Sequence, residues 1–176
     1  MKTSIALIGF MGVGKTAVGK ALAEKLGRKF VELDLLIEQR MGKSIADIFQ
    51  QDGETAFREV EIRVTEGVSK DKNLVIACGG GIVLNKLNIE RLRKSAKMVY
   101  LTASPGVIQK RVTNDEGQRP LLKVDNPELT IREMLSFRKP FYEGAADIKI
   151  DTSKLDINAV AKQIISKLRE DESFNF

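Results

Sequence analysis

The chain has 176 residues, which is the size of about one domain. It carries 29 Lys and Arg against 24 Asp and Glu, a net charge of +5, with one Cys and no His. Without His there is no Ser-His-Asp triad, no His-bound zinc and no imidazole base, and one Cys excludes an intrachain disulfide or cysteine metal cluster. Any acid–base chemistry must therefore use carboxylates, Lys, Tyr or bound ions.

Five short runs of apolar or β-branched residues, each bounded by turn residues, predict strands. In chain order these runs are residues 4–8, 29–33, 74–77, 97–101 and 146–150. Runs this apolar are typical of strands covered on both faces, as in a parallel sheet. The last run is more polar, so we expect it at an edge.

Segments with helical apolar spacing or capping residues separate these runs. The expected helices are residues 15–26, 44–51, 53–69, 104–112, 130–142 and 157–168. Ser104 is a predicted N-cap, and capping boxes are predicted at Ser44 and Thr130. We expect the polar tail, residues 170–176, to fray. Strands that alternate with helices predict an α/β fold with a mostly parallel sheet.

One long segment, residues 113–126 (TNDEGQRPLLKVDN), fits neither pattern because it is polar, rich in turn residues and interrupted by Pro120. A loop of this length in a compact domain is usually functional or disordered. Because it lies between two expected helices, we predict that it forms a mobile lid.

The strongest motif is GFMGVGKT at residues 9–16, which matches G-x-x-x-x-G-K-[ST] between an apolar strand and an amphipathic helix. Its glycines let backbone N–H groups turn toward phosphate oxygens, and the helix N-terminus adds positive potential. Lys15 is expected to reach the β- and γ-phosphates, and Thr16 to bind Mg²⁺. The plainer alternative is a glycine-rich turn with a surface Lys. The context favours a nucleoside triphosphate site.

Two further groups follow predicted strands, where ligands bind in open parallel sheets. Three glycines at residues 79–81 predict a backbone that approaches a ligand closely, although a permissive turn would also explain them. Glu32 and Asp34, two apart on the expected strand, would share a face. They could hold Mg²⁺ or accept a hydroxyl proton, or simply form a solvated strand end. Cys78 is interpreted as a small buried apolar residue.

Together these residues resemble the shikimate kinase family. The resemblance spans nearly the whole chain and includes the phosphate motif, the acidic strand end, FREVE at residues 57–61 and GGGIV at residues 79–83. It also includes RPLL at residues 119–122 and the R-x-x-x-Y of Arg138 and Tyr142.

The resemblance implies a P-loop NTPase fold of the nucleoside-monophosphate-kinase type, with one domain over residues 1–176, strand order 2-3-1-4-5 and a lid. It implies transfer of the ATP γ-phosphate, with Mg²⁺, to the 3-hydroxyl of shikimate, in the route to chorismate and aromatic amino acids. The shikimate-binding segment would span about residues 32–61.

Roles for individual residues also follow from the resemblance. The catalytic residues would be Lys15, Asp34 and Arg119. Shikimate would contact Asp34, Arg58, Gly79, Gly80, Gly81 and Arg138. ATP would contact Gly12, Val13, Gly14, Lys15, Thr16, Ala17, Arg111, Arg119 and Ser153. Thr16 would bind the metal, with Glu32 acting through water. The family usually has Asp where this chain has Glu32, which leaves the metal coordination open.

Two other readings remain at this point. The chain could be another small P-loop kinase, acting on gluconate or a nucleotide, or a non-catalytic nucleotide-binding module. The positive charges are scattered rather than clustered, so an anionic small molecule is a better partner than nucleic acid. No apolar run approaches the ~18 residues that span a bilayer. We expect a cytoplasmic monomer that binds neither nucleic acid nor membrane.

Overall fold

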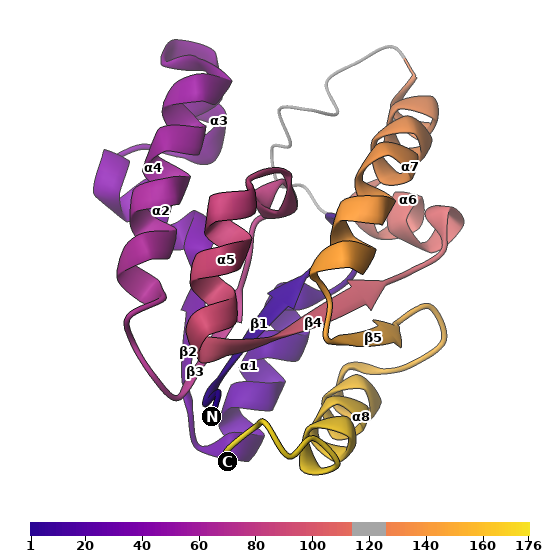
Figure 1. Cartoon of the computed structure of the whole chain (residues 1–176). Coiled ribbons are helices and arrows are strands. Elements are labelled where there is room, and N and C mark those ends of the chain that lie inside the picture. Colours follow the sequence, from indigo (N-terminus) through magenta and orange to yellow (C-terminus); the bar gives the residue numbers. More distant parts are fainter. Residues whose placement is uncertain (114–125) are drawn as a thin grey trace.

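The computed structural model describes residues 1–113 and 126–176. Residues 114–125 of the predicted lid, Arg119 among them, therefore lie outside the described residues. The described residues form a five-stranded parallel sheet in the order β2-β3-β1-β4-β5 (Figure 1). The strands are β1 (Ser4–Ile8), β2 (Lys29–Glu32), β3 (Leu74–Ala77), β4 (Ala96–Thr102) and β5 (Ile148–Asp151).

Burial follows the position of each strand in the sheet. Every residue of β1 and β3 is buried, and β4 is buried until its last residue. The edge strand β5 alternates buried and exposed residues, which confirms the prediction that it lies at an edge. The predicted strand order and parallel direction are also confirmed.

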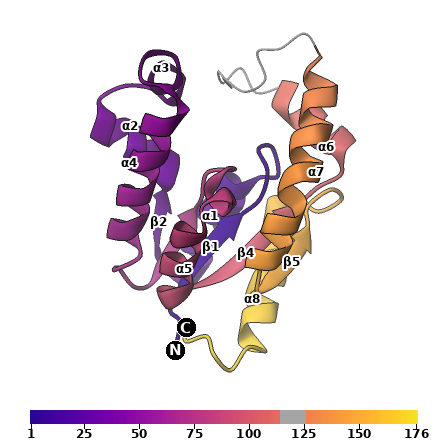
Figure 2. The same ribbon diagram turned by 45° about the horizontal axis from the view of Figure 1, so that its top comes forward.

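Helices cover both faces of the sheet, as parallel strands require. Helices α5 and α7 lie in front of the sheet in Figure 2, whereas α1 packs against α8 on the opposite face. The helices are α1 (Lys15–Leu26), α2 (Leu33–Met41), α3 (Ile45–Gln51), α4 (Gly53–Val68), α5 (Lys86–Ser95), α6 (Pro105–Thr113), α7 (Pro127–Ala145) and α8 (Ile157–Arg169), with a 3₁₀ turn η1 (Ile82–Leu84). None of the described helices has the length and apolar character needed to span a membrane.

The second strand is shorter than predicted, and this changes the geometry of the acidic pair. β2 ends at Glu32, whose extended backbone caps α2, and the helix begins at Leu33. Leu33 and Ile37, one helical turn apart, bury the face of α2 that fixes this turn. Asp34 therefore lies in the first turn of a helix, and the predicted shared strand face of Glu32 and Asp34 is wrong.

One predicted helix boundary also needs correction, and two helices, α2 and α5, were not predicted. Helix α7 begins three residues earlier than predicted, because the Asn126 side chain accepts a hydrogen bond from the N–H of Leu129. Thr130 lies inside the first turn, where its hydroxyl donates to the Asn126 carbonyl oxygen. Helix α5 was not predicted; it begins after Asn85, which accepts from the N–H of Leu87. Most residues of α5 are polar, so the short apolar stripe that packs inward gives no clear helical pattern in the sequence.

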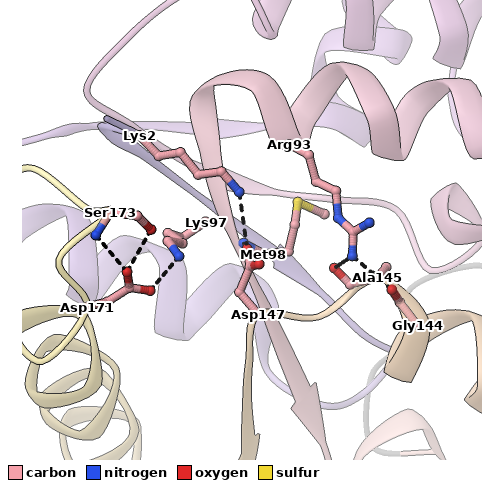
Figure 3. A network of polar contacts seen from close by, with 9 residues as sticks. All are labelled: Lys2, Arg93, Lys97, Met98, Gly144, Ala145, Asp147, Asp171 and Ser173. Carbon is pink, nitrogen blue, oxygen red and sulfur yellow. Dashed lines mark hydrogen bonds and ion pairs between the residues drawn. The ribbon is translucent and has the colours of Figure 1, made fainter.

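The prediction that the C-terminal tail frays is wrong. The backbone N–H of Lys2 donates to the Ser173 carbonyl, and the N–H of Asn175 donates to the Lys2 carbonyl. Phe174 is buried beneath this contact. Figure 3 shows the charged side chains around it, including the ion pair between Lys97 and Asp171. Both chain ends are thus fixed at the amino ends of the strands.

Candidate active site

The phosphate-binding motif forms the turn between β1 and α1. Gly9, Gly12 and Gly14 have φ angles of 147°, 77° and 97°, a region that side chains disfavour. A Cβ atom on Gly9 would also overlap the carbonyl oxygen of Leu101. The glycines are therefore required by the backbone path of the loop, apart from any ligand.

Lys15 and Thr16 begin α1 and point back into this loop. The Lys15 ammonium donates to the carbonyl oxygens of Gly9 and Phe10, each at 2.8 Å. The Thr16 hydroxyl donates to Glu32 Oε1 at 2.6 Å, which ties the loop to the end of β2. A cation, a hydroxyl and a carboxylate are therefore held at the N-terminus of a helix, a position that favours anions.

A cavity of about 400 Å³ opens beside the loop at the carboxyl ends of the strands. Its lining brings together predicted residues from the phosphate loop, β2, α2, the glycine segment and α6. The lining residues are Met11, Gly12, Gly14, Lys15, Thr16, Ala17, Glu32, Asp34, Ala77, Cys78, Gly80 and Arg111. Val13 is buried beneath the loop instead.

Asp34 is the least satisfied polar group of this cavity. Its Oδ1 atom is buried and finds no hydrogen-bond partner among the residues that the structure describes. Burial raises the pKa of the Asp34 carboxyl, while the charge of Lys15 opposes this rise. A carboxylate that lacks solvent and partners is a stronger base than one in water, and it faces the space where a ligand can bind.

Three side chains lie against the backbone of the glycine segment. A Cβ on Gly79 would lie 2.8 Å from Asp34 Oδ1, and a Cβ on Gly81 would overlap the Arg58 guanidinium. At Gly80 the nearest Arg138 atom would be at an ordinary contact distance of 3.7 Å. Each glycine therefore faces one of the three side chains predicted to bind shikimate, and close approach explains at least two of the glycines.

Arg58 is held by two carboxylates on its own helix. It donates to Glu54 Oε1 at 3.0 Å and to Glu61 Oε2 at 3.0 Å. Burial opposes the charge on Arg58, but Glu61 and Glu54 outweigh this effect and raise its pKa. Glu61 is only 1% exposed, and burial raises its pKa against the influence of Arg58. The guanidinium is thus fixed and charged beside Gly81.

Arg138 approaches the glycine segment from the other side. It is buried on α7, and its guanidinium lies 5.8 Å from the centre of the Phe10 ring. Tyr142, four residues later on the same helix face, is completely buried and donates a hydrogen bond to the Gly80 carbonyl. Arg58 and Arg138 thus approach the glycine segment from α4 and α7.

Arg111 connects the phosphate loop to the loop after β5. Its guanidinium donates to the Gly12 carbonyl at 3.2 Å, and to the Thr152 hydroxyl and carbonyl at 3.0 Å each. The buried Thr152 hydroxyl in turn contacts the Val13 carbonyl at 3.0 Å. Ser153, which was predicted to contact ATP, accepts a hydrogen bond from the N–H of Ser104 at 2.9 Å.

Sequence reasoning gave no role to Glu61 and did not predict the hydrogen bonds of Thr152. The spacing of three between Arg58 and Glu61 on a predicted helix is a usable signal, because such residues are neighbours on a helix surface. For Thr152 no comparable signal exists, since its partners Val13 and Arg111 are distant in sequence.

The donor set suits Mg²⁺, which takes oxygen ligands and usually keeps several waters and substrate phosphates. Thr16 and Glu32 provide a hydroxyl and a carboxylate that already touch at 2.6 Å. Within residues 1–113 and 126–176 no cluster of three or more metal-binding side chains occurs. A site completed by water and phosphate, rather than an all-protein cage, fits these residues.

A phosphate loop joins the first strand and the first helix of a parallel sheet, beside a cavity with a buried carboxylate. The glycine segment next to this cavity lies against two arginines, and together these features define a P-loop kinase with a second site for a small anion. The shikimate kinase family model matches residues 11–169. The shikimate kinase of Caldanaerobacter subterraneus subsp. tengcongensis is 46% identical over 92% of this chain and 94% of its own. That of Thermodesulfovibrio yellowstonii is 46% identical over 93% and 94%.

A solved structure agrees with these relatives. Shikimate kinase from Acinetobacter baumannii in complex with shikimate superposes with a TM-score of 0.93 and 36% identity, over 98% of this chain and 96% of that one. The chain belongs to the shikimate kinase family. Members of this family are ATP-dependent kinases that use Mg²⁺.

Proposed function

We propose that the chain transfers the γ-phosphate of ATP to the 3-hydroxyl of shikimate, giving shikimate 3-phosphate and ADP in aromatic amino acid biosynthesis. The observation that carries this proposal is the position of Asp34. Its unpartnered Oδ1 lies in the same cavity as Lys15 and against Gly79, the first of three glycines that also face Arg58 and Arg138.

On the nucleotide side, the phosphate loop binds the triphosphate through its backbone N–H groups. Lys15 moves from the Gly9 and Phe10 carbonyls to the β- and γ-phosphates and neutralises charge in the transition state. Arg111, fixed by Gly12 and Thr152, lies against the nucleotide base. The remaining proposed contacts are those of Gly12, Val13, Gly14, Thr16, Ala17 and Ser153.

On the acceptor side, Arg58 and Arg138 bind the shikimate carboxylate, because a guanidinium fork matches a carboxylate in shape and charge. Glu61 keeps Arg58 in place from behind. Gly79, Gly80 and Gly81 give the ring a flat backbone surface. Asp34 then orients the hydroxyl and takes its proton at Oδ1 as the phosphoryl group is transferred.

Thr16 would hold Mg²⁺ directly, and Glu32 would hold it through water. The metal ion neutralises the charge of the phosphates when bound. The water shell lets Glu32 replace the usual Asp, since its extra methylene lengthens the arm by about 1–1.5 Å. Arg119, outside the described residues, stays a predicted catalytic and ATP-binding residue.

We also propose that residues 1–176 act as one kinase domain, with a shikimate-binding segment at about residues 32–61. It would be a cytoplasmic monomer that binds neither nucleic acid nor a membrane. The scattered positive charges support an anionic metabolite rather than nucleic acid as its partner.

The test is ADP release in the presence of ATP and Mg²⁺ with shikimate, gluconate, nucleoside monophosphates or no acceptor. We expect rapid ADP release with shikimate and not with the other acceptors. The NMR spectrum of the product should show the phosphate on the 3-oxygen of shikimate. Faster release with another acceptor would refute the proposal in favour of a different small-molecule kinase. Nucleotide binding without acceptor-dependent release would indicate a non-catalytic module.

A further inference from the structure

Tyr142 is one of the two tyrosines of the chain, and its environment is unusually well defined. The side chain is 0% exposed, and its ring stacks on Tyr100 of β4 with centres 5.1 Å apart and planes 17° from parallel. Its hydroxyl donates to the carbonyl oxygen of Gly80. A phenylalanine would fill the same space, so packing alone does not explain the hydroxyl.

The hydroxyl is suited to act as a permanent donor. Burial raises the pKa of Tyr142, and the neighbouring Arg138 guanidinium only partly opposes that rise. The group therefore stays protonated at any physiological pH. Stacking on Tyr100 fixes the ring of Tyr142 and therefore the position of its hydroxyl. The hydrogen bond then restrains the Gly80 carbonyl to one position.

Gly80 occupies the centre of the site. A Cβ built on it would lie 3.6 Å from the N–H nitrogen of Met11 and 3.7 Å from both the Gly9 carbonyl oxygen and Arg138 Nη1. Gly80 lines the cavity, whereas Tyr142 is buried behind it. A shift of Gly80 would thus change its spacing to Arg138 on one side and to the phosphate loop on the other.

We propose that Tyr142 is a positioning residue for acceptor binding, whose hydroxyl fixes the Gly80 carbonyl and so sets the spacing between the glycine segment and Arg138. Tyr142 and Arg138 lie four residues apart on α7, so one helix face places both groups. Tyr142 acts through Gly80 and does not touch substrate. The inference rests on the proposed function, because it takes shikimate as the acceptor.

The kinetic test is Tyr142→Phe, which keeps the stacked ring and removes the hydroxyl. The matched control is Tyr100→Phe, which removes the hydroxyl from the other member of the pair. We expect Tyr142→Phe to raise KM for shikimate about threefold to tenfold, as loss of one buried hydrogen bond does. Its kcat and its KM for ATP should change less than about twofold, and Tyr100→Phe should behave as wild type.

An unchanged KM for shikimate in Tyr142→Phe, or an equal rise in both KM values, would overturn the inference. So would an equal rise in KM for shikimate in Tyr100→Phe. These outcomes differ from failure of the proposed function, in which the wild-type enzyme itself would not turn over shikimate.

A spectroscopic test keeps Tyr142 intact and decides the question even where Tyr142→Phe fails to fold. In Tyr100→Phe labelled with ¹³Cζ-tyrosine, Tyr142 gives the only labelled signal. Saturating shikimate should shift this signal, because the ligand loads the Gly80 segment to which the hydroxyl is bonded, while ADP should shift it less. No shift with shikimate, or a larger shift with ADP, would contradict the inference.

Discussion

At the amino ends of the parallel strands, charged side chains are paired with each other, whereas at the carboxyl ends a carboxylate is buried without a full set of partners. Around the chain termini, Lys97 pairs with Asp171, and Lys2 lies 3.5 Å from Asp147, which also accepts from the N–H of Met98 (Figure 3). At the other end of the sheet, Asp34 Oδ1 finds no partner among the described residues.

The two regions differ in what their charges do to carboxyl pKa values. Hydrogen bonds from Lys97 and Ser173 lower the pKa of Asp171 to about 2, so its charged form is favoured in the folded state. Burial raises the pKa of Asp34, so its charged form is disfavoured. The charge of Asp171 at the amino ends therefore stabilises the fold, whereas the charge of Asp34 at the carboxyl ends is held at a cost in stability.

The largest effect is expected when the lysine of the phosphate loop is replaced. Lys15→Ala should lower kcat by about 10²–10³, because one charge contact in the transition state is lost. Lys20→Ala, an exposed lysine on the same helix, is the matched control and should keep wild-type kcat. Steady-state ADP release and thermal unfolding measure both. Near-normal turnover of Lys15→Ala would refute the assignment of the phosphate loop.

Removal of either arginine proposed to bind the acceptor carboxylate should affect one substrate only. Arg58→Ala and Arg138→Ala should each raise KM for shikimate at least about thirtyfold, the effect of about 2 kcal/mol lost from a buried charged contact, and leave KM for ATP near wild type. Arg58→Ala should also lower the melting temperature, because Glu61 stays buried without its partner.

The controls for these two variants are exposed arginines on the same helices, Arg63→Ala on α4 and Arg132→Ala on α7. Both should leave the two KM values unchanged. An equal loss of affinity for ATP and shikimate in Arg58→Ala or Arg138→Ala would contradict the proposal that these arginines bind the acceptor carboxylate.

A smaller effect is expected when Glu32, the proposed water-mediated ligand of Mg²⁺, is replaced. Glu32→Ala should increase the Mg²⁺ concentration needed for half-maximal rate several-fold, roughly as loss of one water-mediated contact, and change KM for shikimate less. Glu32→Asp should keep substantial activity, and the exposed Glu24→Ala is the control. If a Mg²⁺ titration of Glu32→Ala shows no shift, the metal role is wrong.

Much of the fold could be predicted from the sequence because its signals are local. The apolar runs of β1 and β3 and the apolar stripe of α8 indicate from their own residues which positions are buried. The phosphate motif follows the first of these strands directly and precedes a helix, as its consensus requires. Asp34 was placed on the wrong element because an apolar run alone does not show where β2 gives way to α2. The helix begins at Leu33 to bury Leu33 and Ile37.

The site was less predictable because its contacts join distant parts of the chain. The triglycine predicted close approach of a ligand, which stays a prediction. The close approach of the Asp34 and Arg58 side chains depends on how α2 and α4 pack against the sheet. The contacts between Tyr142 and Gly80 and between Thr152 and Val13 have no local signature. The predicted ligand contacts of individual residues stay predictions until the variants are measured.

The most direct test of the contrast between the two ends is one substitution made at each, Asp34→Asn and Asp171→Asn, with melting temperature measured against pH. The folded-state pKa of Asp34 is raised, so wild type loses stability as pH rises through that value. Asp34→Asn should therefore melt about 2–4 °C higher than wild type at pH 7, the shift that about 1 kcal/mol produces at this size, with turnover nearly abolished.

The folded-state pKa of Asp171 is lowered to about 2, so its stabilisation is present above its ordinary pKa and is lost as pH falls toward 2. Asp171→Asn should melt about 1–3 °C lower than wild type at pH 7 and keep its turnover, as loss of one surface ion pair implies. Both differences should shrink near pH 3. A lower melting temperature for Asp34→Asn at pH 7, or lost turnover in a folded Asp171→Asn, would contradict the division of roles between the two ends of the sheet.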